Sequence, residues 1–103
     1  MNVNHGFHAT MTARPGRGDE VVRVLLNAPS MPNEDCVVFL VSRSAENPDT
    51  VHVTEGWTSR EAHSRFFETA AAQALVAALQ PLLDGESRYT DEVPVGGKAV
   101  FEN

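Results

Sequence analysis

Cysteine is almost absent from this chain, because Cys36 is the only one among 103 residues. A single cysteine excludes an intrachain disulfide and a metal site built from several thiolates. Cys36 opens an apolar run that continues to Val41, so we expect a packed and unreactive thiol.

Long apolar segments and clusters of basic residues are also missing. No run approaches the roughly 20 apolar residues that a membrane span requires. The segment MNVNHGFHAT has neither the positive region nor the apolar core of a secretory signal, so we expect a cytoplasmic protein without a membrane partner. The basic residues are scattered singly and the formal net charge is −6, which argues against a nucleic-acid partner.

The remaining composition is that of one globular domain, with 42% hydrophobic and 21% charged residues. We expect a single domain over residues 1–103, with a core from about 3 to 95 and a C-terminal tail at 96–103. Within that tail, residues 98–101 follow two glycines and are interpreted as a segment that crosses to a partner subunit.

Alternating apolar residues predict four strands, at residues 3–12, 36–43, 50–57 and 88–95. Helical spacing predicts one helix between the first two strands. It predicts a second in two pieces, one running from Thr58 toward Ala70 and one at 72–83, which Pro81 bends or ends early. For this second helix, Thr58 and Glu61 fit a capping box, with Thr58 as the N-cap residue.

The element order is β-α-β-β-α-β, which is the ferredoxin-like α+β pattern with an antiparallel sheet. Right-handed crossovers then place the third strand between the first and the second. In the second strand, Cys36, Val38 and Leu40 share one face, and the other face is also apolar. Helices of one short chain cover a single face, so the other sheet face is expected to contact a second subunit in a homodimer.

Four short segments carry a family resemblance, and the most specific is the strand end Glu55-Gly56-Trp57 followed by Ser59-Arg60-Glu61-Ala62. With Arg14-Pro15-Gly16, the strand 37–43 with its Asn47-Pro48-Asp49 turn, and Leu79 to Leu83, the chain resembles the antibiotic biosynthesis monooxygenase superfamily. The resemblance implies a dimeric α+β barrel in which two sheets face each other. It also implies that some relatives oxidise quinols or anthrone-like polyketides with oxygen and need neither metal nor flavin.

Trp57 and the helix residues His63, Phe66 and Phe67 are the first candidates for a small aromatic ligand's pocket. Trp57 ends its strand beside a helix N-terminus, where it can wall a pocket or simply anchor the core. His63 shares a stripe with both phenylalanines at i, i+3 and i+4. It is the best candidate for a catalytic base, although a core histidine is the more usual outcome for such a position.

Four other residues complete the candidate set. His8 and His52 lie on strands expected to be neighbours, so their rings can approach each other, but no third ligand is suitably spaced for a metal. They are more simply surface or dimer-contact residues. Tyr89 can donate to a ligand or lie at a rim, and Glu55 is interpreted as a structural partner of an arginine, with a shifted base as the alternative. We expect no metal and no cofactor.

The resemblance also argues against haem degradation. Relatives with that activity carry a strand-one asparagine, a tryptophan and a helix histidine. Trp57 matches, but Ala9 and either Phe66 or Phe67 stand at the other two positions. Three functions remain: a cofactor-independent monooxygenase for a quinol, phenolic or polyketide substrate, a non-catalytic dimeric domain that binds a small aromatic molecule, or a non-redox polyketide enzyme such as a cyclase.

Overall fold

The computed structural model describes residues 2–100 and has the element order expected for a ferredoxin-like fold. The elements are β1 (His5–Thr12), α1 (Gly18–Leu26), β2 (Cys36–Arg43), β3 (Thr50–Trp57), α2 (Arg60–Phe67), α3 (Ala70–Leu79), the short 3-10 helix η1 (Gln80–Leu82) and β4 (Arg88–Glu92). The predicted fold class is confirmed. None of the described helices is long and apolar enough to cross a bilayer.

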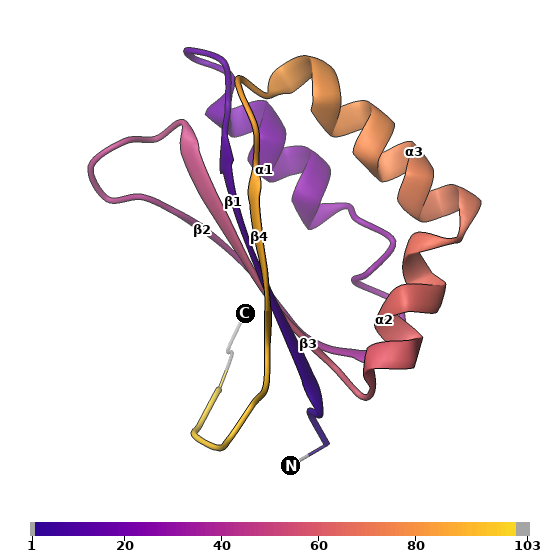
Figure 1. The fold of residues 1–103 in the computed structure, drawn as a ribbon. Coiled ribbons are helices and arrows are strands. Elements are labelled where there is room, and N and C mark those ends of the chain that lie inside the picture. Colours follow the sequence, from indigo (N-terminus) through magenta and orange to yellow (C-terminus); the bar gives the residue numbers. More distant parts are fainter. Residues whose placement is uncertain (1, 101–103) are drawn as a thin grey trace.

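The sheet has the strand order β2-β3-β1-β4, and every pairing is antiparallel. The third strand therefore lies between the first and the second, as predicted. All helices cover the same face of the sheet, as Figure 1 shows. The last strand is shorter than predicted and ends at Glu92, two residues before Pro94, which has no N–H to donate to a ladder.

The core lies between this face and the helices, in two clusters. The larger joins inward-facing residues of β1 and β3 to α1, α3 and η1, and contains Ala9, Met11, Ala13, Val21, Leu25, Val51, Val53, Leu79 and Leu82. The smaller gathers Trp57, Ala62, Phe66 and Ala72 around the start of α2 and α3. The helix ends early as predicted, because α3 gives way to a 3-10 turn before Pro81.

The faces of β2 differ from the prediction because the strand is bulged. The register passes from Cys36 opposite Trp57 to Val38 opposite Gly56, so Val37 has no partner of its own. A bulge shifts the side-chain alternation by one residue. Cys36 consequently packs against the Trp57 cluster on the helix side, whereas Val38 and Leu40 keep the predicted helix-free face.

The predicted capping box is also wrong by one residue. Ser59 is the N-cap of α2 and its Oγ accepts from the backbone N–H of Ala62. The Thr58 hydroxyl instead donates to Asp35, which lies in the loop before β2. The helix stops at Phe67 rather than reaching Ala70, because Thr69 caps a new helix by accepting from the N–H of Ala72.

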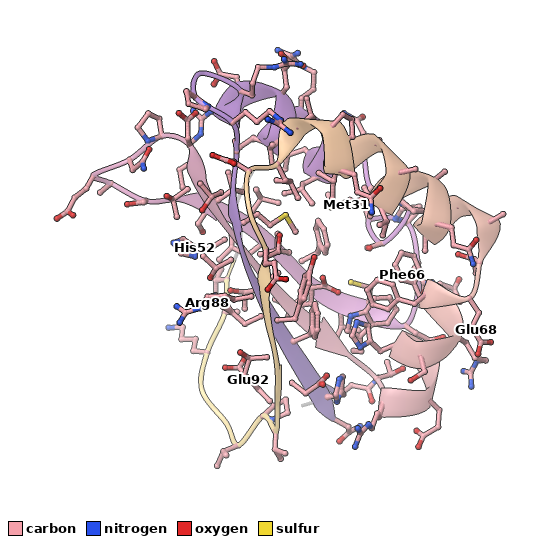
Figure 2. The ribbon with its side chains drawn as sticks, turned by 45° about the horizontal axis from the view of Figure 1, so that its top comes forward. Met31, His52, Phe66, Glu68, Arg88 and Glu92 are labelled. Carbon is pink, nitrogen blue, oxygen red and sulfur yellow. The ribbon has the colours of Figure 1, made fainter. Side chains whose placement is uncertain are left out.

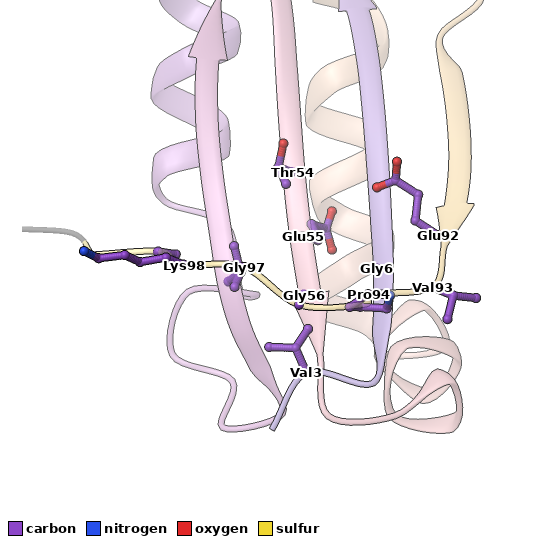
Figure 3. A pocket seen from close by; sticks show the side chains of 13 residues that line it. Val3, Gly6, Thr54, Glu55, Gly56, Glu92, Val93, Pro94, Gly97 and Lys98 are labelled. Carbon is purple, nitrogen blue, oxygen red and sulfur yellow. The ribbon is translucent and has the colours of Figure 1, made fainter. Parts of the chain in front are cut away.

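The helix-free face is apolar along β2, as predicted for that strand, but not along the central strands. Leu40 is 40% exposed there, but the central strands present mostly threonine, histidine and glycine. The C-terminal segment crosses this face near Gly56. Figure 3 shows the stretch from Pro94 to Gly97 lying across the strands. The predicted crossing segment 98–101 lies partly outside the described residues, since the description ends at residue 100.

Asp49 connects two loops at one end of the sheet. Its carboxylate accepts from the N–H of Gly16 at 3.0 Å and from the N–H of Gly18 at 2.9 Å. The turn before α1 is thus fixed to the hairpin between β2 and β3. A Cβ at Gly18 would collide with the carbonyl oxygen of Pro48, so the approach requires glycine.

Replacing Gly18 by alanine is expected to destabilise the protein by about 2 kcal/mol. Overpacking against backbone costs about 3 kcal/mol at its upper end, and the better helix propensity of alanine returns about 1 kcal/mol. Urea unfolding measures the difference. Gly96→Ala is the matched control, because a Cβ there meets nothing within 4 Å. Equal stability of the two variants would contradict the collision.

Candidate functional site

Trp57 is the fully buried anchor of the candidate site, with 0% of its surface exposed. The alternation of β3 points it toward the helices, beside the start of α2. Its indole Nε1 donates to Glu55 Oε1 at 2.8 Å. The buried polar atom of the indole is therefore satisfied by a carboxylate two residues earlier on the same face of the strand.

Among residues 2–100, Glu55 pairs with no arginine, so the predicted structural ion pair is wrong. Only 9% of its side chain is exposed, and its carboxylate lies 3.8 Å from His63 Nε2 in addition to the indole. Burial raises the pKa of Glu55 above its ordinary value, while the bond from Trp57 opposes this shift. The carboxyl group is a base strengthened by its surroundings.

His63 projects from the second turn of α2 into a ring of aromatic side chains. Its ring centroid lies 4.8 Å from that of Phe7 and 5.0 Å from those of Trp57 and Phe67. Burial lowers the pKa of His63, the nearby His5 lowers it further, and Asp91 opposes both. The imidazole is thereby favoured in its neutral form, in which one nitrogen can accept a proton.

The Nε2 atom of His63 is buried and has no hydrogen-bond partner among the described residues. Leaving such a group unpaired costs about 1–3 kcal/mol. Glu55 Oε1 is the nearest acidic atom, but 3.8 Å is too long for a hydrogen bond. The arrangement holds a nitrogen ready for a partner that the protein does not supply.

A small apolar cavity of about 60 Å³ lies between the sheet and helices α2 and α3. Phe7, Glu55, Phe66, Phe67 and Tyr89 are among the residues that line it. Phe67 is 40% exposed and Tyr89 is 61% exposed, so both stand at its outer edge. The predicted inward stripe of α2 is therefore correct for His63 and Phe66 but not for Phe67.

The structure brings five of the seven predicted residues together and separates the other two. Those that gather on the helix side are Trp57, His63, Phe66, Phe67 and Tyr89. The His8 and His52 rings stack at 5.8 Å, as expected for neighbouring strands, but they belong to the helix-free face. Figure 2 shows His52 on the side of the sheet away from Phe66.

Sequence reasoning missed His5, Phe7 and Asp91. His5 Nε2 contacts Asp91 Oδ1 at 3.0 Å, and the His5 ring lies 5.2 Å from the His63 ring. His5, His63 and Asp91 together form a group of potential metal ligands. The alternation of β1 already placed His5 and Phe7 on the buried face, but Asp91 required the register between β1 and β4.

The cysteine borders this site without joining its chemistry. Burial and the nearby Glu55 raise the pKa of Cys36 to about 12. The thiolate is the reactive form of cysteine. The expectation of an inert thiol is consistent with that pKa.

A protein-family comparison matches residues 5–78 to the antibiotic biosynthesis monooxygenase family. The matched segment exceeds half of the chain, and the protein belongs to this family. Membership supports a monooxygenase-like function in general and names no substrate. A comparison with curated proteins gives no match.

Solved structures agree with the family. A Chloroflexus aurantiacus protein described as a "putative antibiotic biosynthesis monooxygenase" is 31% identical, with a TM-score of 0.80 over 92% of this chain and 96% of that one. A Caulobacter crescentus protein with the same description is 22% identical, with a TM-score of 0.81 over 92% and 93%. A Pseudomonas aeruginosa protein is 21% identical, with a TM-score of 0.78 over 93% and 98%. The last two, at these identities, show the fold alone.

Glu55→Gln is expected to stabilise the protein increasingly as the pH rises. Between 4.5, the ordinary pKa of Glu55, and its raised value, the folded state binds a proton that the unfolded state has lost. The free energy of unfolding of the wild type therefore falls across this window, and glutamine removes the fall. Urea unfolding at pH 5 and pH 8 measures the gain over wild type.

The exposed loop variant Glu46→Gln is the control, because it makes the same substitution outside the candidate site. The contribution of His63 to the free energy of unfolding rises with pH below pH 6.5. Its pKa is lowered in the folded state, so the unfolded state binds more protons there. A Glu55→Gln advantage that is the same at both pH values would show that the carboxyl group is not shifted.

Proposed function

We propose that the protein is a cofactor-independent monooxygenase that oxidises a small phenolic, quinol or polyketide-type substrate with molecular oxygen. The observation that carries the proposal is the buried pair of Glu55 and His63 beside an apolar, aromatic-lined cavity. Family membership supports the oxygen chemistry.

The pair has opposite pKa shifts, which suit it to accept a proton. Burial raises the pKa of Glu55 and lowers that of His63, so the two pKa values move toward each other. Glu55 lines the cavity and meets the substrate hydroxyl, while His63 stands 3.8 Å behind it. Trp57 positions the carboxylate through its indole N–H. Removing a phenolic proton makes the ring electron-rich.

The substrate itself is the reductant in this scheme. For a substrate with a ring CH₂ group that becomes a ketone, the base first removes a proton. The resulting anion reduces oxygen and forms a peroxide at that carbon. Loss of water then leaves one oxygen atom in the ketone and the other in water, so the four electrons from the substrate reduce one oxygen molecule. A dry apolar cavity protects the anion from being protonated again by solvent.

The cavity must enlarge to admit such a substrate. Its volume of about 60 Å³ is smaller than the roughly 150 Å³ cavity known to hold benzene. Phe67 and Tyr89 stand at the edge and are both substantially exposed, so rotation of these two side chains opens the cavity toward solvent. Phe7 stacks on Tyr89 at 5.8 Å and supplies an aromatic wall beneath it.

Oxygen uptake with a panel of quinols and anthrones tests the proposal. We expect uptake above the rate without protein, reduced by about 10²-fold or more in His63→Ala or Glu55→Gln, since general base catalysis contributes at least that factor. Trp57→Ala is expected to reduce it as well. His52→Ala is the matched control, because His52 lies on the other face and should leave the rate unchanged. If His52→Ala reduced oxygen uptake as much as His63→Ala does, the assignment of the site to the helix side would be wrong.

One observation favours a second candidate, a dimeric domain that binds a small aromatic molecule without catalysis. Phe66 and Phe67 already occupy much of the space beside the cavity, and the remaining volume is small. Ligand binding without oxygen uptake on any substrate, in a folded protein, would support this candidate. Turnover of a polyketide without oxygen would instead indicate a cyclase.

We also propose a homodimer through the helix-free sheet face. Val37 and Leu40 of β2 are about 40% exposed there or at its edge, and Val93 and Val95 of the C-terminal segment are 83% and 96% exposed. A stable interface buries about 800 Å² on each partner. A second sheet over this face would cover these apolar groups. The C-terminal segment, which already crosses the face near Gly56, would lie between the two sheets.

Leu40→Glu is expected to convert the dimer to a monomer, because it places a charge at an apolar contact. Light scattering after size-exclusion chromatography measures the mass. Leu26→Glu is the matched control, since Leu26 is 52% exposed at the end of α1 on the helix side. A wild-type monomer, or a dimer that survives Leu40→Glu, would contradict this interface.

A further inference from the structure

His5, His63 and Asp91 form a three-residue group whose chemistry the proposed oxidation does not use fully. One ligand atom from each lies within 4.8 Å of those of the other two. The three come from β1, α2 and β4, which are far apart in the sequence and meet at the end of the sheet covered by α2. The grouping therefore depends on the complete fold.

The group contains a nitrogen that lacks a partner. His63 Nε2 is buried, and the residue as a whole is only 6% exposed. His5 is equally buried and directs its Nε2 to Asp91 at 3.0 Å. Buried polar atoms almost always have a partner, and an exception often marks a bound water or ion. Here the open nitrogen belongs to a ligating residue type and lies among other such residues.

We propose that His5, His63 and Asp91 bind a divalent transition-metal ion such as zinc. Two imidazole nitrogens and one carboxylate are a common ligand set for zinc and for iron(II), with further positions left for water or substrate. Asp91 supplies the negative charge and has 60% of its side chain exposed, which gives an ion a route from solvent. Glu55, 3.8 Å from His63 Nε2, adds a second carboxylate nearby.

The geometry requires only a small adjustment. Metal–nitrogen bonds of about 2.0–2.1 Å place the ligand atoms of a tetrahedral ion roughly 3.3–3.5 Å apart. The present limit of 4.8 Å then closes by about 1.3–1.5 Å. Asp91 is on the edge strand β4, which pairs with β1 alone, so its side chain has room to move.

The inference does not depend on the proposed oxidation. A metal on a ring nitrogen of neutral His63 occupies the lone pair that a proton would take, so the metal-bound protein cannot use His63 as a base. If both proposals hold, zinc inhibits oxygen uptake. Metal binding is measured without any substrate, so failure of one proposal leaves the other intact.

The first experiment titrates tag-free, full-length protein, freed of metal with a chelator, with Zn²⁺ by calorimetry. We expect one ion per chain. Asp91→Asn and His63→Asn should each weaken Zn²⁺ binding by about tenfold or more, since even outer partners of metal ligands contribute 10–100-fold. Asp91→Asn is the safer variant because its side chain is exposed and removing the charge leaves the core untouched.

The stacked pair His8 and His52 supplies the control. These two histidines lie in the same sheet with ring centroids 5.8 Å apart, comparable to the 5.2 Å of His5 and His63. The double variant His8→Asn and His52→Asn is expected to bind Zn²⁺ as the wild type does. Cobalt(II) in place of zinc gives a visible absorption band whose intensity reports the number of ligands, and Asp91→Asn should change it.

Three outcomes would overturn the proposal. Absence of binding by the wild type is the first. Binding that is unchanged in both Asp91→Asn and His63→Asn would place the ion elsewhere. Binding that is lost in the His8 and His52 double variant would assign it to the helix-free face. Circular dichroism of each variant establishes that it is folded before binding is compared.

Discussion

A single layer of helices covers one face of the sheet, and the rest of the structure follows from this constraint. Apart from the bulge in β2, each strand alternates, so every second residue faces the helices. In β3 that face holds Val51 and Val53, which pack in the core, and then Glu55 and Trp57, which form the site. Core and site are thus consecutive parts of one row of side chains, and the other row lies on the helix-free face.

The covered face contains polar groups that burial would ordinarily penalise. Glu55 is satisfied by the indole of Trp57, and His5 by Asp91, but His63 Nε2 is left open. Burial moves the pKa values of Glu55 and His63 in opposite directions, which favours the uncharged form of each. A core designed only for stability would place apolar residues here, so the retained groups point to a function.

Alternation and turn residues were sufficient to predict the fold, and both β2 and β3 have the predicted bounds. Effects that depend on tertiary pairing were not predictable. The bulge that turns Cys36 toward the helices arises where β2 meets β3. Asp91 joins the site only because β4 pairs with β1. The alternation of β3 places His52 on the face opposite Glu55 and Trp57, and this alone separates it from His63.

Family membership names neither the substrate nor the residues that act on it, so the chemistry is argued from the side chains. His63 is the imidazole that α2 offers to the site, and Phe66 and Phe67 follow it about one turn later. A single nitrogen then stands between two uses, because a lone pair that binds a proton cannot bind a metal at the same time. The two proposals use different neighbours: Glu55 lies 3.8 Å from His63 Nε2, beyond hydrogen-bond distance, and the His5–Asp91 pair would supply a second imidazole and a carboxylate for a cation. Under the two proposals, occupancy of the His63 imidazole by a proton or by a metal ion distinguishes one chemistry from the other.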